Sequence, residues 1–371
     1  MMWKKHKLSE IGTVVGGATP STTVERFYGG DIPWLTPKDL SNFQDRYIER
    51  GERNITQEGL DSCSAQLLPA NSVLFSSRAP IGYVAIAKNP IATNQGFKSI
   101  IPNEKVDSLF LYYILRYNKE RIEAMGSGTT FKEVSGAVMK NVEISLPSLE
   151  EQRRIAGILG AIDDKIENNR RINTNLELQA QALYKQWFVD NRSEDWETLT
   201  LDDVAAISAG GDKPQVCSEQ KTQECNIPIY SNSIDREGLY GYTNNPRIIE
   251  NSITISARGT IGYVCLRTEP YVPIVRLISV IPTHDNMSAY FLYLWALTQN
   301  ISGTGTTQQQ LTVPAFRTTK IVVPSQEILI KFNKVVKPIF DSIKQYKKEN
   351  ITLATLRDTL LPKLMNGEIK I

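Results

Sequence analysis

The amino-acid sequence predicts α/β (α+β) globular domains, two per chain in a pseudo-twofold repeat, separated by two long α-helices that form an antiparallel intramolecular coiled coil. Two observations lead to this fold class: an apolar seam of helical spacing occurs twice, and the segments that precede the two seams share local motifs. A chain of 371 residues, 41% of them apolar, has room for more than one core. We expect globular domains at residues 1–147 and 191–324, and long helices at residues 148–190 and 325–371.

The first long helix is indicated by apolar residues that recur at alternating spacings of four and three. This alternation is typical of the buried seam of a coiled coil. Ser148, with Glu151 three residues later, forms a capping box that places the start of the helix. Two asparagines interrupt the seam midway, and buried asparagines of this kind fix the register at some cost in stability. The seam positions are Ile155, Leu159, Ile162, Ile166, Asn169, Asn173, Leu176 and Leu183.

The second long helix repeats this seam 177 residues later. Its positions are Phe332, Val336, Ile339, Ile343, Tyr346, Asn350, Leu353, Leu360 and Leu364. Because the chain runs out along the first helix and returns along the second, we expect the two helices to pair antiparallel. Two alternatives remain open: each helix packs on its own globular domain, or the seam drives homodimerisation.

The two globular domains share short motifs in the same order. Residues 78–84 (Arg-Ala-Pro-Ile-Gly-Tyr-Val) match residues 258–264 (Arg-Gly-Thr-Ile-Gly-Tyr-Val) at five of seven positions. Each domain then has a short apolar helix, a glycine-threonine loop, and a strand that ends in a proline-marked turn. The offset between the copies falls from 193 residues at the start to 177 at the long helices, so the first domain is the longer one.

Composition excludes several classes of protein. The formal net charge of +2 does not predict a binder held to nucleic acid by charge alone. The four cysteines form no Cys-x-x-Cys pair, which favours reduced thiols. No apolar run is long enough for a membrane span or a signal peptide, so we expect a cytoplasmic protein without membrane contact.

A search for catalytic motifs finds none. The chain lacks a Gly-Lys dipeptide and therefore a Walker A loop, and it has no Gly-x-Gly-x-x-Gly motif. Its two histidines, His6 and His284, lie at unmatched positions, which argues against histidine-based catalysis or a histidine metal site. We therefore expect no catalytic, cofactor-binding or metal-binding residues on this chain.

The repeated Arg-x-x-Ile-Gly-Tyr motif is the best candidate for binding. An arginine at the tip of a hairpin-like corner suits a phosphate group or a guanine edge. The motif could equally stabilise the fold in both copies, and each polar loop residue could be ordinary solvated surface. In the first domain the candidates for DNA contact are Lys38, Ser77, Arg78, Tyr83, Gln95 and Lys132. In the second domain they are Asn232, Arg236, Arg258, Tyr263, Arg276 and Gln308.

The architecture and three stretches resemble the specificity (S) subunit of type I restriction–modification systems, the HsdS family. The stretches are Trp34-Leu35-Thr36-Pro37-Lys38-Asp39-Leu40, Asn94-Gln95-Gly96-Phe97-Lys98 and Leu146-Pro147-Ser148-Leu149-Glu150-Glu151-Gln152-Arg153-Arg154-Ile155-Ala156. The second half of the chain differs from these motifs. It has Ile274-Val275-Arg276-Leu277 where the first half has Asn94-Gln95-Gly96-Phe97, and its helix opening, Pro324-Ser325-Gln326-Glu327, lacks the downstream Gln-Arg.

This resemblance implies a DNA-recognition subunit without catalysis of its own, present in one copy per complex. Each domain would read one half of a bipartite, asymmetric site in double-stranded DNA, and the helix pair would fix the gap. Modification (methyltransferase) subunits would bring S-adenosylmethionine, and restriction (translocase/nuclease) subunits would bring ATP and Mg. The departures in the second half leave open whether both ends recruit modification subunits equally. The alternative is a non-enzymatic coiled-coil scaffold with two ligand-binding modules and no DNA role.

Overall fold

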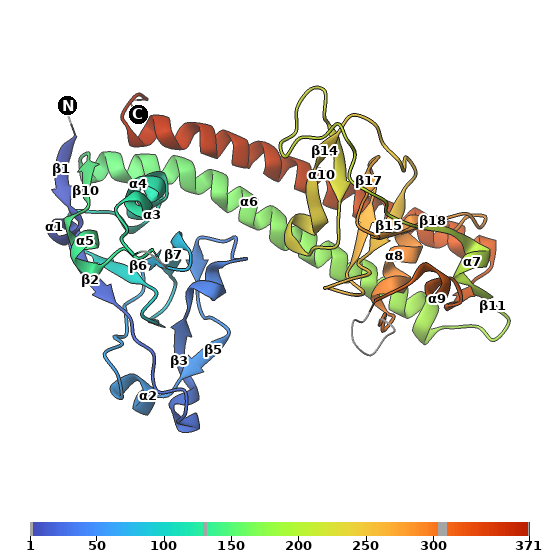
Figure 1. Ribbon diagram of the computed structural model, residues 1–371, viewed down its shortest axis with the longest axis horizontal. Coiled ribbons are helices and arrows are strands. Elements are labelled where there is room, and N and C mark those ends of the chain that lie inside the picture. The colour runs from blue at the N-terminus through green and yellow to red at the C-terminus, as the bar shows by residue number, and fades with distance from the viewer. Residues whose placement is uncertain (1–2, 129–131, 303–309, 370) are drawn as a thin grey trace. The chain divides into compact units, whose positions relative to one another are not determined.

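The computed structural model describes residues 3–128, 132–302, 310–369 and 371, and its ribbon is shown in Figure 1. The chain forms two compact units: unit 1 comprises Met1–Arg170 and Lys347–Ile371, and unit 2 comprises Arg171–Tyr346. Each unit contains one globular domain and half of each long helix. The expected fold class is confirmed: mixed α/β domains alternate with two long helices.

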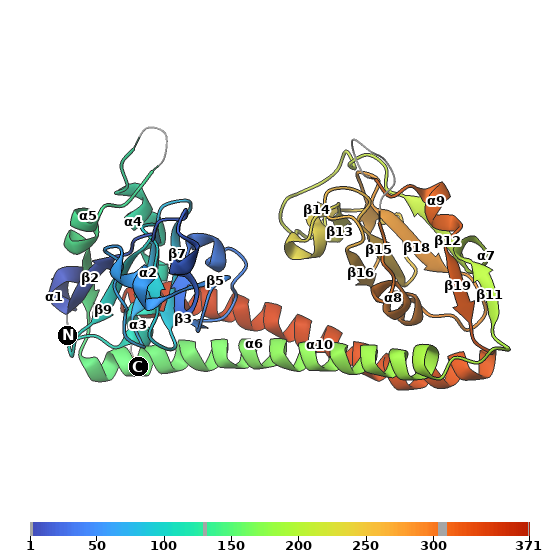
Figure 2. The same cartoon turned by 90° about the horizontal axis from the view of Figure 1, so that it is seen from below.

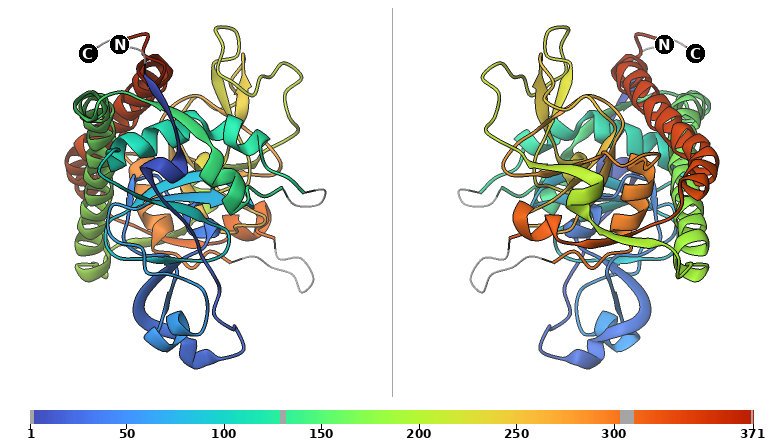
Figure 3. Two further views of the ribbon diagram at one scale, coloured as in Figure 1. Left: turned by 90° about the vertical axis from the view of Figure 1, so that its left-hand side faces the viewer. Right: turned by 90° about the vertical axis from the view of Figure 1, so that its right-hand side faces the viewer.

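Unit 1 is built on a five-stranded sheet of order β2-β9-β6-β7-β4 and a three-stranded sheet of order β5-β3-β8. The strands are β2 (Gly12–Gly16), β3 (Tyr28–Leu35), β4 (Tyr47–Ile48), β5 (Arg53–Ile55), β6 (Val73–Ser77), β7 (Ile81–Ala87), β8 (Ala92–Thr93) and β9 (Lys98–Pro102). The short helices are α1 (Leu8–Ile11), η1 (Glu25–Phe27), η2 (Pro37–Leu40), α2 (Gln57–Asp61), α3 (Ser108–Tyr117), α4 (Lys119–Ala124) and α5 (Gly136–Asn141). Figure 3 shows the smaller sheet and α2 standing off the main sheet.

Helix α3 joins the main sheet of unit 1 to the long helices. Its first turn is capped by Asp107, whose side chain accepts a hydrogen bond of 3.0 Å from the Phe110 amide. Residues 110–115 are all buried, so this part of the helix is covered on every side. It packs in one core cluster with Ile155 and Leu159 of the first long helix (Figure 2).

Unit 2 repeats this plan with a four-stranded sheet, β12-β18-β15-β16, and a three-stranded sheet, β14-β13-β17. The strands are β12 (Ala205–Ala209), β13 (Ile227–Tyr230), β14 (Leu239–Thr243), β15 (Ser252–Ile255), β16 (Val264–Arg267), β17 (Val272–Pro273) and β18 (Ile278–Pro282). The short helices are α7 (Leu201–Val204), η4 (Asp235–Gly238), α8 (Ala289–Leu297) and α9 (Val313–Arg317). Helix α8 takes the place that α3 has in unit 1.

Each domain is closed by a separate two-stranded antiparallel sheet made of its first and last strands. In unit 1, β1 (Lys4–Lys7) pairs with β10 (Glu143–Leu146). In unit 2, β11 (Glu197–Thr200) pairs with β19 (Lys320–Val323). The last strand of each domain leads directly into a long helix. We call each of these two-stranded sheets a neck.

The long helices are α6 (Leu149–Tyr184), which continues as a π-helical turn (Lys185–Asp190), and α10 (Gln326–Met365). The Ser148 hydroxyl accepts a 3.3 Å hydrogen bond from the Glu151 amide at the start of α6. In the described part of the chain, no helix is both long and apolar enough to cross a membrane.

The two long helices run antiparallel within unit 1. Arg357 Nη1 donates to Asp163 Oδ1 at 2.7 Å, and Asn169 Nδ2 donates to Asn350 Oδ1 at 2.8 Å. Residue numbers that increase along α6 therefore face residue numbers that decrease along α10. The π-helical turn and α10 also meet in unit 2, where the Phe188 and Phe332 rings lie 4.7 Å apart.

None of the expected seam positions is exposed. The buried ones are Ile155, Leu159, Ile166, Asn169, Phe332, Val336, Ile343 and Leu364. The half-buried ones are Ile162, Asn173, Leu176, Leu183, Ile339, Tyr346, Asn350, Leu353 and Leu360. Because several of them belong to the same clusters as α3 and α8, the long helices pack both on each other and on the globular domains.

A loop of the first domain is also fastened to α6 by buried charge. Arg46 is 4% exposed, and its backbone N and Nε donate to Glu167 Oε1 at 3.0 and 2.9 Å. Its guanidinium also bonds Asp164, and Arg170 donates to the Gln44 carbonyl at 2.6 Å. Burial opposes the charged form of Arg46, but the hydrogen bonds to Glu167 and Asp164 outweigh it and raise its pKa above the ordinary value.

Candidate nucleic-acid interface

In unit 1, three loops are tied together at the ends of the two sheets. The Asn94 amide donates to the Leu35 carbonyl at 2.8 Å, which joins the loop after β8 to the end of β3. The Ser77 amide donates to the Gly96 carbonyl at 2.7 Å, which joins that loop to the β6–β7 turn. We define loop cluster 1 as residues 36–40, 77–80, 94–98 and 132–134.

Unit 2 ties its corresponding loops together in the same way. The Ile274 amide donates to the Tyr230 carbonyl at 2.9 Å. Asn232 bridges the other two loops, because its Oδ1 accepts from the Ala257 amide at 2.7 Å and its Nδ2 donates to the Val275 carbonyl at 2.6 Å. We define loop cluster 2 as residues 231–238, 256–263, 274–277 and 310–311.

Arg78 lies in the β6–β7 turn of loop cluster 1 and is paired with a carboxylate. Its Nη1 lies 3.6 Å from Glu133 Oε2, and Lys98 Nζ lies 3.2 Å from Glu133 Oε1. Glu133 is held beside the turn because the next residue, Val134, donates its amide to the Ser77 carbonyl at 2.9 Å. The arginine is about one-third exposed.

Arg258 occupies the same place in loop cluster 2, but its partner is neutral. Its Nε and Nη2 donate to Gln310 Oε1 at 3.2 and 3.0 Å. The next residue, Leu311, donates its amide to the Ala257 carbonyl at 3.0 Å, which is the counterpart of the Val134 contact. The Arg258 side chain is exposed. The repeated arginine therefore has a repeated neighbour, a carboxylate in one unit and a carboxamide in the other.

The other candidates in unit 1 lie in different surroundings. Lys38 is exposed and lies 3.1 Å from Glu52, Gln95 is exposed and bonds the Thr19 hydroxyl, and Lys132 is exposed. Tyr83 is half-buried against the core. Ser77 is fully buried, and its hydroxyl donates to the Gly96 carbonyl at 3.1 Å, so its selection as a DNA contact is corrected: it holds two loops together.

In unit 2, Arg236 and Arg276 are exposed at loop tips, and both have positive φ angles, 47° and 60°. Asn232 is half-buried with both ends of its amide engaged, so it serves as a clamp between loops. Tyr263 is half-buried, and burial followed by the nearby Cys265 thiol raises its pKa. Gln308 lies outside the described residues.

Sequence reasoning missed two arginines that lie near loop cluster 2. Arg267 is buried beneath it: its Nη2 donates to the Glu237 carbonyl at 2.7 Å and its guanidinium lies 3.5 Å from the centre of the Tyr230 ring. Arg247 is exposed, and its guanidinium lies against Gly211. Neither arginine has a copy in the first domain, so the search for repeats gave no signal for them.

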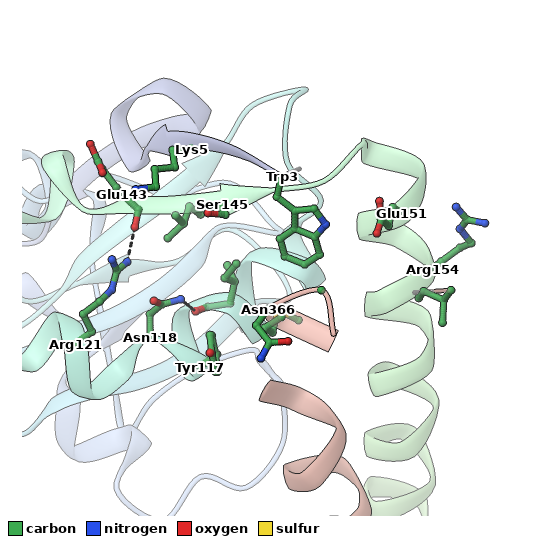
Figure 4. A pocket seen from close by; sticks show the side chains of 15 residues that line it. Trp3, Lys5, Tyr117, Asn118, Arg121, Glu143, Ser145, Glu151, Arg154 and Asn366 are labelled. Atoms are coloured by element: carbon green, nitrogen blue, oxygen red, sulfur yellow. Dashed lines mark hydrogen bonds between the residues drawn. The ribbon is translucent and has the colours of Figure 1, made fainter. Parts of the chain in front are cut away.

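A separate pocket of about 810 Å³ lies at the neck of unit 1 (Figure 4). Trp3 and Asn366 bring the two ends of the described chain to this pocket, and Glu151 and Arg154 reach it from the first turns of α6. Arg121 closes one side by donating to the Glu143 carbonyl. Among the described residues, no three His, Cys, Asp or Glu side chains are grouped closely enough to hold a metal ion.

Comparison with known proteins explains the repeat. The family described as "Type I restriction modification DNA specificity domain" matches residues 2–178 and again residues 193–358. The chain belongs to this family. Each match covers one globular domain and most of the long helix that follows it, so the unit of this family is a domain joined to a helix.

Relatives and a solved structure agree with this assignment. The chain is 38% identical to the "Type I restriction enzyme MjaIX specificity subunit" of Methanocaldococcus jannaschii, over 100% of this chain and 94% of the relative. It is 25% identical to the "Type I restriction enzyme HindI specificity subunit" of Haemophilus influenzae, over 90% of this chain and 89% of the relative. The crystal structure of an S subunit from M. genitalium shares the fold, with a TM-score of 0.59 at 20% identity, covering 98% of this chain and 96% of that one.

Proposed function

We propose that this chain is the DNA sequence-recognition subunit of a type I restriction–modification complex. The observation that supports it most strongly is the repeat itself: both halves match the DNA specificity family, and both hold an arginine in the same turn beside the same neighbouring position. The chain recognises DNA and leaves the chemistry to its partners. It acts in the cytoplasm, in one copy per complex.

Each unit reads one half of a bipartite, asymmetric site in double-stranded DNA. Loops at the ends of strands can enter a major groove, where arginine reads guanine edges and contacts phosphates. The exposed cations of the loop clusters supply this chemistry locally although the whole chain carries only +2. Because the loops of the two clusters differ in sequence, the two half-sites differ as well.

The neck of unit 1 serves to recruit a modification subunit. The pocket in Figure 4 contains Glu151 and Arg154, which belong to the stretch that most resembles the family. Modification subunits supply S-adenosylmethionine for adenine methylation, and restriction subunits supply ATP- and Mg-dependent translocation and cleavage. The second domain lacks this stretch, so recruitment at its neck is weaker.

Methylome sequencing tests this function directly. A host that expresses the full chain with the adenine modification subunit encoded beside it should acquire N6-methyladenine on a split motif with a constant gap. A host that expresses the modification subunit alone is the control. A stable complex that leaves no mark would favour a coiled-coil scaffold without a DNA role.

The helix pair is proposed to set the gap between the half-sites. Deleting one facing heptad from α6 and from α10 should leave both half-sites unchanged and alter only the number of unspecified base pairs between them. The same methylome measurement reports it. An unchanged gap would remove the helix pair as the spacer.

A further inference from the structure

The tip of the β17–β18 loop in unit 2 presents an apolar side chain to solvent in a strained conformation. Val275 is 52% exposed and has a φ angle of 53°, and the next residue, Arg276, has a φ angle of 60°. A β-branched residue in this left-handed region is an outlier, because its branched side chain crowds the backbone. Residues held in this way cost folding free energy and concentrate at functional sites.

The surrounding structure fixes this tip firmly. The Val275 and Arg276 amides donate to the Gly211 and Gly210 carbonyls, each at 2.9 Å. The Asn232 side chain holds the Val275 carbonyl at 2.6 Å. Three backbone groups of the strained tip are therefore hydrogen-bonded to the rest of unit 2, while the isopropyl and guanidinium groups are exposed. About half of the Val275 surface remains open to a ligand.

The fold itself does not require this strain. In unit 1 the corresponding loop contains Gln95 and Gly96, and neither of them has a positive φ angle. Gln95 is exposed, as Val275 is, but it is polar and adopts an ordinary backbone conformation. The strained, apolar tip is thus a local feature of the second domain. The loop at the corresponding place in unit 1 forms without a strained, apolar tip.

The neighbours of Val275 indicate what it meets. The exposed side chains of loop cluster 2 include Arg236, Arg258 and Arg276, of which Arg236 lies 3.7 Å from Asp235 and Arg258 bonds the neutral Gln310. The exposed acids Asp235 and Glu237 belong to the same cluster, so the three arginines leave it a small excess of positive charge. An apolar group in such a cluster suits a polyanion that carries a small apolar feature. The thymine 5-methyl group in the major groove of DNA is such a feature, and short apolar side chains are the ones that contact it.

We propose that Val275 reads a thymine in the half-site of unit 2 by packing on its 5-methyl group, while Arg276 binds an adjacent phosphate. This inference rests on the proposed function and deepens it by naming one base and the residue that reads it. It requires at least one thymine in that half-site, at a fixed position. It also requires that the valine contribute to binding and not to folding.

The test uses the full chain assembled with its modification subunit. After the motif is known, each thymine of the second half-site is replaced by deoxyuridine, which removes only the methyl group. The wild-type complex should bind about fourfold more weakly when one particular thymine is replaced. Val275→Gly should bind the thymine probe about fourfold more weakly and lose all response to the deoxyuridine replacement.

Melting temperatures and two further variants, Ile249→Ala and Arg276→Ala, separate recognition from folding. Val275→Gly should have a melting temperature equal to or above that of the wild type, because glycine adopts the left-handed backbone without strain. Ile249→Ala, which alters another exposed apolar residue of unit 2, should change neither binding nor melting. Arg276→Ala should weaken all probes equally and reduce the salt dependence of binding by about one phosphate contact.

Several results would overturn the inference. These are a second half-site without thymine, binding that does not respond to deoxyuridine, or a Val275→Gly complex that still responds to it. A lowered melting temperature with an unchanged motif would make Val275 structural. A wild-type complex that selects no split motif would remove the proposed function itself, which distinguishes that failure from these.

Discussion

In unit 1 the two long helices bury charged and amide side chains between them, whereas in unit 2 they bury aromatic rings. Asp163 of α6 accepts hydrogen bonds from Arg357 of α10 and from Tyr113 of α3, at 2.7 and 2.6 Å. In unit 2, Phe332 of α10 meets Phe188 at 4.7 Å and Trp187 at 5.6 Å. The same two helices are therefore held together by polar contacts in unit 1 and by aromatic contacts in unit 2.

The two kinds of contact contribute differently to the alignment of the helices and to their stability. Buried ion pairs and amides stabilise little compared with apolar residues of equal volume, but a shifted register would leave them unpaired. Aromatic clusters bury large areas and gain further from edge-to-face contacts between the rings. The polar pairs of unit 1 therefore fix how the helices align, and the aromatic cluster of unit 2 contributes mainly to stability.

The largest effect is expected at the centre of the aromatic cluster. Phe332 is fully buried, so Phe332→Ala should lower the free energy of unfolding of unit 2 by about 4 kcal/mol. Urea denaturation followed by the fluorescence of Trp187, Trp196 and Trp295 would measure it. The exposed Leu178→Ala is the matched control on the same helices. A loss below about 1 kcal/mol would contradict the assigned role of the cluster.

A slightly smaller effect is expected from breaking the buried charge in unit 1. Glu167→Ala leaves Arg46 buried without its main partner and should cost about 3 kcal/mol. The double variant Arg46→Met with Glu167→Leu should recover most of that loss, because it removes both charges. Thermal melting of the single and double variants measures the coupling. A double variant as unstable as the single one would show that the pair itself supplies the stability.

The two repeated arginines should differ in their effect on DNA binding. Arg258 has a neutral partner and Arg78 a carboxylate, so Arg258→Ala should cost about 2 kcal/mol of affinity at its half-site, and Arg78→Ala less at the other. Competition binding with probes altered in one half-site at a time separates the two. Equal losses at both half-sites would indicate a general charge effect. A lowered melting temperature with unchanged affinity would instead show that the arginine stabilises the fold.

The smallest effect is a dependence on alkaline pH that both units share. Burial raises the pKa of Tyr113 and of Tyr293, and the hydrogen-bonded carboxylates Asp163 and Glu177 raise it further. A tyrosine in the unfolded chain ionises near pH 10, whereas Tyr113 and Tyr293 in the folded chain stay protonated to higher pH. Above about pH 10 only the unfolded chain releases these protons, so the free energy of unfolding falls as the pH rises; below about pH 10 it is unaffected. The loss is about 1.4 kcal/mol per pH unit for each tyrosine.

Urea midpoints measured between pH 9 and pH 11 would check this dependence. Tyr113→Phe and Tyr293→Phe should each remove one tyrosine's share of the alkaline slope. At neutral pH, Tyr113→Phe leaves Asp163 paired with Arg357, so it should lower the free energy of unfolding less than Tyr293→Phe does. A slope unaffected by either substitution would assign the alkaline loss to other groups.

Periodic features of this fold could be predicted from the sequence, and contacts between distant residues could not. The helical seam is a local pattern, so its positions follow from spacing alone. The bond between Arg46 and Glu167 joins positions 121 residues apart and has no copy in the second half. No periodicity or repeat points to it.

The matching position of the two arginines could be predicted from the sequence, but the contacts around them could not. Arg78 and Arg258 follow Ser77 and Ala257, whose carbonyls accept matched hydrogen bonds from Val134 and Leu311, so the two turns correspond as the repeated motif predicts. Ser77 was selected because it precedes Arg78, but it ends a strand whose five residues are all buried. Asn232 was selected as a polar loop residue and proved to be a clamp. The left-handed conformation of Val275 depends on the carbonyls of Gly210 and Gly211, which lie far from it in sequence.

The necks have a consequence for inheritance. Because the first and last strands of each domain pair with each other, Glu197 facing Val323 and Lys4 facing Leu146, everything between them forms a closed cassette. Recombination between two genes at the neck sequences would exchange a whole domain and keep both long helices, provided that the incoming domain packs on them as α3 and α8 do. A lineage could then acquire a new half-site in one genetic event.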